Sequence, residues 1–315
     1  MMMRKVMNKI KGLTQQHQQN IISSNDLSKL NRGIEEVKLL NAKILSHQNN
    51  LAQDEILTNL NKAEFKVFSQ WGDDGIIQFL VDYLQPENNI FIEFGVEDYE
   101  EANSRFLMIN NCWKGLVMDS SQEHINHIKN SNVYWKYQLE AIPAFVNRNN
   151  INNLLQSYLK GSYADLMIID IDGNDYWIWE AIDVTNPTIV IVEYNSLFGC
   201  DRAITIPYSD NFLRTKSHYS NLYYGASLPA FFHLAKQKGY QLIACNSNGN
   251  NAYFVRADKM KKLKALEPSQ AFRAASFRES RTVDHQLSYL NAAAAQQLLS
   301  GLPVYNVMTG KEETF

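Results

Sequence analysis

The chain has 315 residues, enough for one large α/β domain with extensions and a substantial buried core. Hydrophobic residues make up 45% of the sequence and charged residues 20%, values typical of a globular protein. The formal net charge of -3 gives no general attraction to nucleic acid or anionic lipid. We therefore expect no nucleic-acid partner, and local Arg and Lys residues must meet any anionic substrate.

The cysteines and the lack of a targeting pattern indicate in which cellular compartment the protein is expected. Cys112, Cys200 and Cys245 are far apart and form neither a CxxC pair nor a disulfide framework, which favours a reducing cytoplasm. The basic N-terminus runs into polar residues instead of an apolar segment, so it does not resemble a secretory signal. No apolar run approaches the roughly 20 residues of a membrane span. We expect a cytoplasmic protein, with peripheral attachment to the inner membrane as the alternative.

Residues 1–62 form a polar extension rich in Asn, Gln and Lys. Its apolar residues recur at alternating spacings of three and four, with Asn41 and Gln48 in two of the same slots. The apolar members are Leu27, Leu30, Ile34, Val37, Ile44 and Leu51. This pattern predicts either a helical hairpin or short coiled coil, through which the chain self-associates, or a single amphipathic helix lying on its own domain.

The run I-F-I-E-F-G-V at residues 90–96 predicts the first strand of a parallel, nucleotide-binding sheet. β-Branched and aromatic residues in a short continuous run fit a strand covered on both faces. Such strands present ligand-binding groups at their carboxyl ends. There Glu93 can accept hydrogen bonds, and Gly95 permits a sharp turn and a close backbone approach to a ligand.

The segments on either side of this strand predict helices. Asp73 or Asp74 can cap a helix that runs to Leu84, and Asn103 or Ser104 can cap one that ends before Trp113. Residues 115–119 predict a second strand ending in Asp119, an acid placed to accept from both ribose hydroxyls of an adenosine. Ser120 and Glu123 have capping-box spacing for the helix that follows.

Further strands and helices alternate along the rest of the chain. We predict strands at 133–139, 166–170, 188–195, 240–245 and 252–256, helices at 151–161, 176–182 and 227–239, and a long insertion at 196–226. The last two strands, joined by N-S-N-G-N-N, form an antiparallel hairpin. Seven strands with this ending predict a Rossmann-like sheet of the class I methyltransferase kind. A dinucleotide-dependent dehydrogenase would more often carry G-x-G-x-x-G, which the sequence lacks.

Polar residues gather where the fourth and fifth predicted strands end. Asp170, Asp172, Glu193 and Asn195 could hold a divalent ion such as Mg²⁺, which would lower the pKa of a coordinated hydroxyl. A metal-free alternative makes one of these carboxylates the general base, and a structural alternative has the acids cap the next helix. His218 in the insertion is a further candidate base.

The ordered set S-Q-W-G-D-D-G, F-I-E-F-G-V, N-S-R-F-L, W-K-G-L-V-M-D, I-D-I-D-G-N-D-Y-W and V-E-Y-N resembles FkbM-like S-adenosylmethionine-dependent methyltransferases. It is most similar to the bacterial branch that O-methylates sugars and surface polysaccharides. The resemblance covers roughly residues 65–257 and departs from the general pattern in having one glycine instead of three after the first strand. From it and the strand ends, we expect a donor site formed by Gln70, Gly72, Asp74, Gly75, Glu93, Gly95, Asn103, Asp119, Ser120 and Asp170.

The resemblance implies a methyltransferase domain at residues 63–260, between the helical extension and a C-terminal extension at 261–315. The implied function is O-methylation of a sugar hydroxyl in O-antigen or capsule synthesis, with S-adenosylmethionine as donor and a sugar or polysaccharide as acceptor. Two alternatives remain open at this point. One is a dinucleotide-dependent oxidoreductase, and the other is a non-catalytic module of a polysaccharide-assembly complex.

Overall fold

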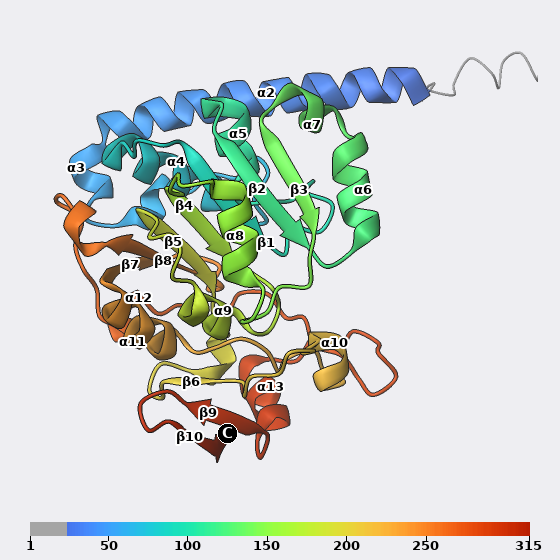
Figure 1. Ribbon diagram of the computed structural model, residues 1–315, viewed down its shortest axis with the longest axis vertical. Helices are drawn as coiled ribbons and strands as arrows, with labels where there is room; N and C mark the ends of the chain where they lie inside the picture. The colour runs from blue at the N-terminus through green and yellow to red at the C-terminus, as the bar shows by residue number, and fades with distance from the viewer. Residues whose placement is uncertain (1–23) are drawn as a thin grey trace, which may run out of the picture. The chain divides into compact units, whose positions relative to one another are not determined.

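The computed structural model describes residues 24–315 (Figure 1). The chain divides into two units, one ending at Ile44 and the other running from Leu45 to Phe315. The larger unit therefore takes in residues 45–62, which we had predicted to belong to the extension, and also the C-terminal tail. The first part of the predicted extension, up to residue 23, lies outside the described residues.

One helix, α2 (Ser24–Leu51), contains the complete apolar repeat of the predicted extension. The heptad-like segment thus forms a single helix and not a hairpin within residues 24–51. Two short helices follow it, α3 (Gln53–Ile56) and η1 (Leu60–Ala63). Ile56, Leu60 and Ala63 are buried in the core of the larger unit, which ties this stretch to the sheet. Within residues 24–315, no helix combines the length and the apolar character needed to cross a membrane.

A seven-stranded sheet in the order β3-β2-β1-β4-β5-β8-β7 forms the centre of the larger unit (Figure 1). Its strands are β1 (Ile90–Phe94), β2 (Lys114–Asp119), β3 (Leu139–Pro143), β4 (Leu166–Ile169), β5 (Ile189–Glu193), β7 (Tyr240–Cys245) and β8 (Asn251–Arg256). Strands β1 to β5 are parallel, and β8 is antiparallel to both β5 and β7. This arrangement confirms the predicted Rossmann-like class I methyltransferase sheet.

The strand order reverses between β1 and β4, which is where α/β sheets of this kind bind ligands. In the register of the sheet, Glu93 on β1 lies beside Val117 of β2 and Ile168 of β4. The carboxyl ends of β1, β2, β4 and β5 therefore meet at one edge. The side chains that follow these strands are brought together there.

Helices cover both faces of the sheet, and their apolar residues form two buried cores. One face carries α4 (Asp73–Leu84), α5 (Arg105–Asn111) and α6 (Gln122–Asn130). The other carries α8 (Ile151–Leu159), α9 (Asp175–Ala181), α11 (Leu228–Lys238) and the short α12 (Pro268–Ala271). Alternate residues of β1 point to opposite cores, with Ile90, Ile92 and Phe94 on one side and Phe91 on the other. Burial on both faces explains the continuous apolar run of this strand.

One predicted strand is wrong. Residues 133–139 contain aromatic and β-branched side chains, but Asn132–Lys136 form a short helix, α7, and β3 begins only at Leu139. Trp135 of this helix is exposed, so its large side chain reflects a surface position and not a buried strand. The segment that pairs with β2 is L-E-A-I-P, whose Leu139 and Ala141 supply its buried positions.

The insertion after β5 and the C-terminal tail fold together into a small second sheet with the order β10-β9-β6. Its strands are β6 (Ile204–Thr205), β9 (Pro303–Asn306) and β10 (Lys311–Thr314). The same two segments also form the helices η2 (Ser196–Phe198), α10 (Arg214–Ser217) and α13 (Ala292–Leu299), and η3 (Ala257–Lys259) follows β8. The C-terminal tail thus supplies the helix α13 and the strands β9 and β10. Their apolar residues pack with Ile204, Ile206 and Leu222 of the insertion.

Candidate functional site

A cavity of about 760 Å³ opens at the edge where the carboxyl ends of β1, β2, β4 and β5 meet. Its lining comes from the strand ends, from the segment before α4, from the insertion and from the tail. The predicted site residues that line it are Gln70, Glu93, Gly95, Asn103, Asp119, Ser120, Asp170, Asp172 and Glu193. The fold therefore brings most of the predicted donor residues and the three acids to one continuous space.

Glu93, at the end of β1, is almost fully buried and has several hydrogen-bond donors around it. Its Oε1 accepts from the Asn103 N–H at 2.9 Å, and its Oε2 accepts from the Ser104 N–H at 3.0 Å and from the Ser104 hydroxyl. Burial raises the pKa of the Glu93 carboxyl. Glu93 therefore orders the turn that enters α5, in addition to lining the cavity.

The loop after β1 has an unusual backbone. Gly95, Glu97 and Tyr99 all adopt left-handed conformations, with φ values of 72°, 47° and 66°. A Cβ added at Gly95 would lie 1.6 Å from the carbonyl oxygen of Asp170, so only glycine fits there. The loop thus makes three left-handed turns at alternate positions although only one of these residues is glycine.

Asp119, at the end of β2, is held by its neighbours on both carboxylate oxygens. Oδ2 accepts from the Glu97 N–H at 3.0 Å, and Oδ1 accepts from the Ser121 N–H at 2.8 Å. The His124 ring nitrogen Nδ1 lies 3.2 Å from the same Oδ1. Ser121, not the predicted Ser120, caps α6 through its side chain, and both serines line the cavity.

An apolar section of the cavity lies beside Asp119. Its residues are Met118 at the end of β2 and Ala144, Phe145 and Val146, which follow β3. The sequence alone did not indicate an adenine-binding position, because the predicted third strand lay too early in the chain. With β3 ending at Pro143, these residues are the ones that a flat, apolar ring system would meet.

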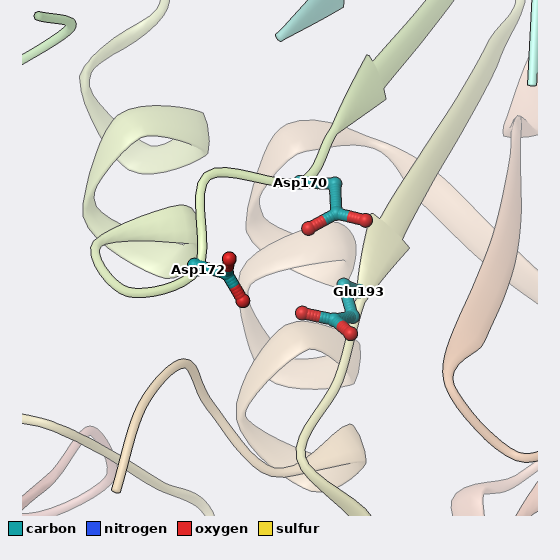
Figure 2. A group of neighbouring side chains, drawn as sticks. All are labelled: Asp170, Asp172 and Glu193. Atoms are coloured by element: carbon teal, nitrogen blue, oxygen red, sulfur yellow. The ribbon is translucent and has the colours of Figure 1, made fainter. Parts of the chain in front are cut away.

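Three carboxylates face one another where β4 and β5 end (Figure 2). One oxygen from each of Asp170, Asp172 and Glu193 can be chosen so that all lie within 4.8 Å of one another. Glu193 is only 9% exposed, and within residues 24–315 its Oε2 has no hydrogen-bond partner. Burial and then the Asp170 carboxylate raise the pKa of Glu193, and burial and then Asp172 raise that of Asp170. Such oxygens can bind a cation or take up a proton.

Arg214 of the insertion supplies a positive charge next to these acids. Its guanidinium group forms an ion pair with Asp172 and a longer one, at 3.3 Å, with Glu279 of the tail. The same group lies 3.9 Å from the centre of the Tyr224 ring, a cation–π contact. The insertion and the tail are therefore both connected to the acids of the cavity.

Three predicted donor residues shape the cavity from behind and do not line it. Asp74 accepts the N–H groups of Val67, Phe68 and Ser69 on its Oδ2, and burial raises its pKa to about 6. A Cβ at Gly75 would lie 2.0 Å from the Ala63 carbonyl oxygen, and one at Gly72 would lie 2.8 Å from the Cβ of Glu64. These residues fix the segment that carries Gln70, and their direct contact with the donor stays a prediction.

Two further predicted site residues, Asn195 and His218, also lie outside the cavity lining. The Asn195 amide donates to the carbonyl oxygens of Leu222 and Tyr224 at 2.9 and 3.0 Å, and its oxygen accepts from the Leu197 N–H. It holds the insertion in place and does not line the cavity. His218 lies 2.7 Å from the Ser220 hydroxyl and is likewise absent from the lining, and burial lowers its pKa. The lining thus gives no support to a catalytic role of His218 or a metal-binding role of Asn195, and both roles stay predictions.

The prediction missed a wall built by the tail. Phe277, Glu279 and Arg281 line the cavity, and the Phe277 ring stacks on that of Trp71 with centroids 6.4 Å apart and planes 14° apart. No sequence pattern identifies these residues, because they lie about 200 positions from Trp71 and outside any regular element. Glu97 and His124 were missed as well, since the first stands at a position where the general pattern has glycine.

No protein-family model matches the chain, and no curated protein matches it. Several solved structures are similar in fold. A putative caffeoyl-CoA O-methyltransferase from Staphylococcus aureus aligns with 69% of this chain and 99% of its own, at 15% identity and a TM-score of 0.42. The N-terminal domain of EvdMO1 with SAH bound aligns with 64% of this chain and 94% of its own, at 9% identity and a TM-score of 0.35. Human N-acetylserotonin methyltransferase in complex with SAM aligns with 70% of this chain and 56% of its own, at 13% identity and a TM-score of 0.33.

Proposed function

We propose that the chain is an S-adenosylmethionine-dependent O-methyltransferase that acts on a sugar hydroxyl in the cytoplasmic synthesis of a surface polysaccharide. The observation that carries the proposal is the division of one cavity into two chemically different parts. Polar and apolar groups suited to the donor follow β1, β2 and β3. Carboxylates suited to the acceptor follow β4 and β5.

The residues at the first three strand ends fit the donor. Asp119 can accept from a ribose hydroxyl, and the apolar residues Met118, Phe145 and Val146 can enclose adenine. Gln70 and Glu93 lie in the same lining, toward which the polar methionine end would extend. A dinucleotide-dependent oxidoreductase is less favoured because the loop after β1 lacks the glycine fingerprint.

Methyl transfer requires the protein to orient the acceptor hydroxyl and to accept its proton. The bound donor would supply an activated methyl group with its own leaving group. The chain must then hold the acceptor hydroxyl in line and take its proton. Glu193 fits the proton-accepting role, because it lines the cavity, is buried, has a raised pKa and has, among the described residues, no hydrogen-bond partner for its Oε2. Asp172 and Arg214 would position the acceptor beside it.

A divalent ion at the same acids is the alternative form of this proposal. Asp170, Asp172 and Glu193 offer the hard oxygen ligands that Mg²⁺ prefers, and the ion would make the acceptor hydroxyl more acidic. Binding such an ion would require Asp172 to loosen its ion pair with Arg214. The metal-free form keeps that ion pair, so the two forms differ in what Arg214 does.

The sugar acceptor rests on the resemblance and on the chemistry of the outer wall. Trp71 and Phe277 present stacked aromatic rings in the lining, and Arg214, Arg281 and Glu279 add polar groups around them. Aromatic faces combined with charged hydrogen-bonding groups suit a polyhydroxylated ring. A purely non-catalytic module has no need for a buried carboxylate with a raised pKa.

The deciding experiment incubates purified protein with methyl-labelled donor and fractionated cell-surface precursors. We expect label in a sugar-containing fraction, and its loss in Asp172→Ala and Glu193→Ala while donor affinity stays within about fivefold of wild type. Exhaustive chelation separates the two forms of the proposal, since full turnover afterwards rules out the metal. Full turnover in both alanine variants would remove the acids from the mechanism.

A further inference from the structure

The hydrogen bonds around Asp119 limit what this residue can do for a ligand. A carboxylate offers about four lone-pair positions for hydrogen-bond donors. Asp119 already receives the Glu97 N–H, the Ser121 N–H and a contact from His124 Nδ1. About one position is therefore left, on Oδ2. This is too few for both hydroxyls of a ribose, so a second acceptor is needed next to Asp119.

Glu97 is the residue that the backbone places there. Its N–H bonds to Asp119 Oδ2, and Glu97 itself lines the cavity. Among the described residues, the Glu97 carboxylate takes part in no hydrogen bond or ion pair. It is thus an exposed, unengaged carboxylate on the residue whose N–H bonds to the nearly saturated Asp119.

The backbone conformation of Glu97 gives an independent reason to assign it a role. A non-glycine residue in the left-handed region is disfavoured relative to glycine. Tyr99, in the same conformation two residues later, offsets that cost because its ring is buried and its hydroxyl bonds to the Ser104 hydroxyl. The Glu97 N–H bonds to Asp119, but its exposed side chain makes no contact of that kind among the described residues. A ligand in the cavity is what its carboxylate can still contact.

We propose that Glu97 is a donor-binding residue whose carboxylate, together with the free position of Asp119, binds the vicinal hydroxyls of the donor's ribose. The proposal rests on the proposed methyltransferase function, because it assumes an adenosine-containing ligand in the first half of the cavity. It adds a second acid to the donor site and assigns the two ribose hydroxyls to different residues.

Calorimetric titration of S-adenosylhomocysteine into variants of the full chain tests the proposal. Glu97→Gly keeps the left-handed backbone and removes the carboxylate, and Glu97→Asn does the same with a residue that tolerates this conformation. We expect each to weaken binding by about tenfold or more. Glu123→Gln is the matched control, because Glu123 is also an exposed carboxylate but lies outside the cavity lining. We expect it to bind within about twofold of wild type.

Competition by nucleosides then identifies the contact. Wild type should prefer adenosine over both 2′-deoxyadenosine and 3′-deoxyadenosine, and Glu97→Gly should lose one of these two preferences while keeping the other. Wild-type affinity in both Glu97 variants, or both preferences intact, overturns the role of Glu97 and leaves the proposed function standing. A wild-type protein that does not bind S-adenosylhomocysteine at all overturns the function itself.

Discussion

The carbonyl oxygen of Asp170 lies where a Cβ of residue 95 would be, only 1.6 Å from the ideal position of that atom. The loop after β1, which belongs to the donor side of the cavity, is therefore in direct contact with the loop after β4, which carries the acceptor-side acids. A change in one loop must move the other. At Gly95 the loops of the two halves of the site approach each other closely.

Replacing Gly95 with alanine should damage both halves. We expect Gly95→Ala to weaken binding of S-adenosylhomocysteine and to lower the free energy of unfolding by more than the roughly 1–2 kcal/mol of a left-handed alanine. Gly161→Ala is the control, since Gly161 also has a positive φ, 89°, but open space around it. Equal losses of stability in urea titrations of the two variants would show that the contact with Asp170 is unimportant.

Glu93→Ala should reduce stability as well as donor binding. The change leaves the buried N–H of Ser104 without its acceptor, while the Ser104 hydroxyl can still bond to the Tyr99 hydroxyl. An unpaired buried donor costs about 1–3 kcal/mol, so we expect a loss of at least that size in the free energy of unfolding. Chemical denaturation measures it directly. An unfolding midpoint equal to that of wild type would contradict the anchoring role described for Glu93.

The buried acids should make the protein less stable as the pH rises. Burial raises the pKa of Asp74 and of Asp175 from 3.8 to about 6. Between these values the folded state therefore holds more protons than the unfolded state. The contribution of these two carboxyl groups to the free energy of unfolding is fully present below about pH 4 and is lost as the pH rises through about 6. We expect Asp175→Asn to show a shallower fall between pH 4 and 6.5 in urea titrations. Wild-type stability that rises across this interval would contradict the assignment.

We propose that α2 mediates self-association through its apolar repeat. As a lone helix, the described part of the smaller unit gives Leu27, Leu30 and Ile34 nothing to pack against within that unit. A chain starting at Leu45 should bind S-adenosylhomocysteine as wild type does but sediment as a smaller species. A chain starting at Asn61 should also lose stability, because it lacks the buried Ile56 and Leu60. If the chain starting at Leu45 forms the same oligomer as wild type in sedimentation, that result would count against self-association through α2.

The sequence predicted most of the sheet because its strands are short, continuous apolar runs, and acids lie at the carboxyl ends of β1, β2, β4 and β5. The register of parallel strands then brings Glu93, Asp119, Asp170 and Glu193 to one edge without further information. The third strand was misplaced since the exposed aromatic residues of α7 imitate a strand when burial is unknown.

Contacts between distant segments could not be predicted in the same way. The rings of Phe277 and Trp71 stack although they are far apart in the sequence. The Asn195 amide donates hydrogen bonds to the carbonyl oxygens of residues 222 and 224. These depend on how the insertion and the tail fold over the sheet. The structural contacts of Asp74 and Gly75 were missed for a related reason. A sequence motif does not show that these residues pack against the backbone of residues 63–69.

Titration of S-adenosylhomocysteine into wild type, Asp119→Ala and Glu193→Ala tests the central claim most directly, because it separates the two parts of the cavity. We predict saturable binding by wild type, a loss of about 1.5–3 kcal/mol or ten- to a hundredfold in Asp119→Ala, and affinity within about fivefold of wild type in Glu193→Ala. Absence of binding by wild type, or equal affinity in folded Asp119→Ala, would contradict the account.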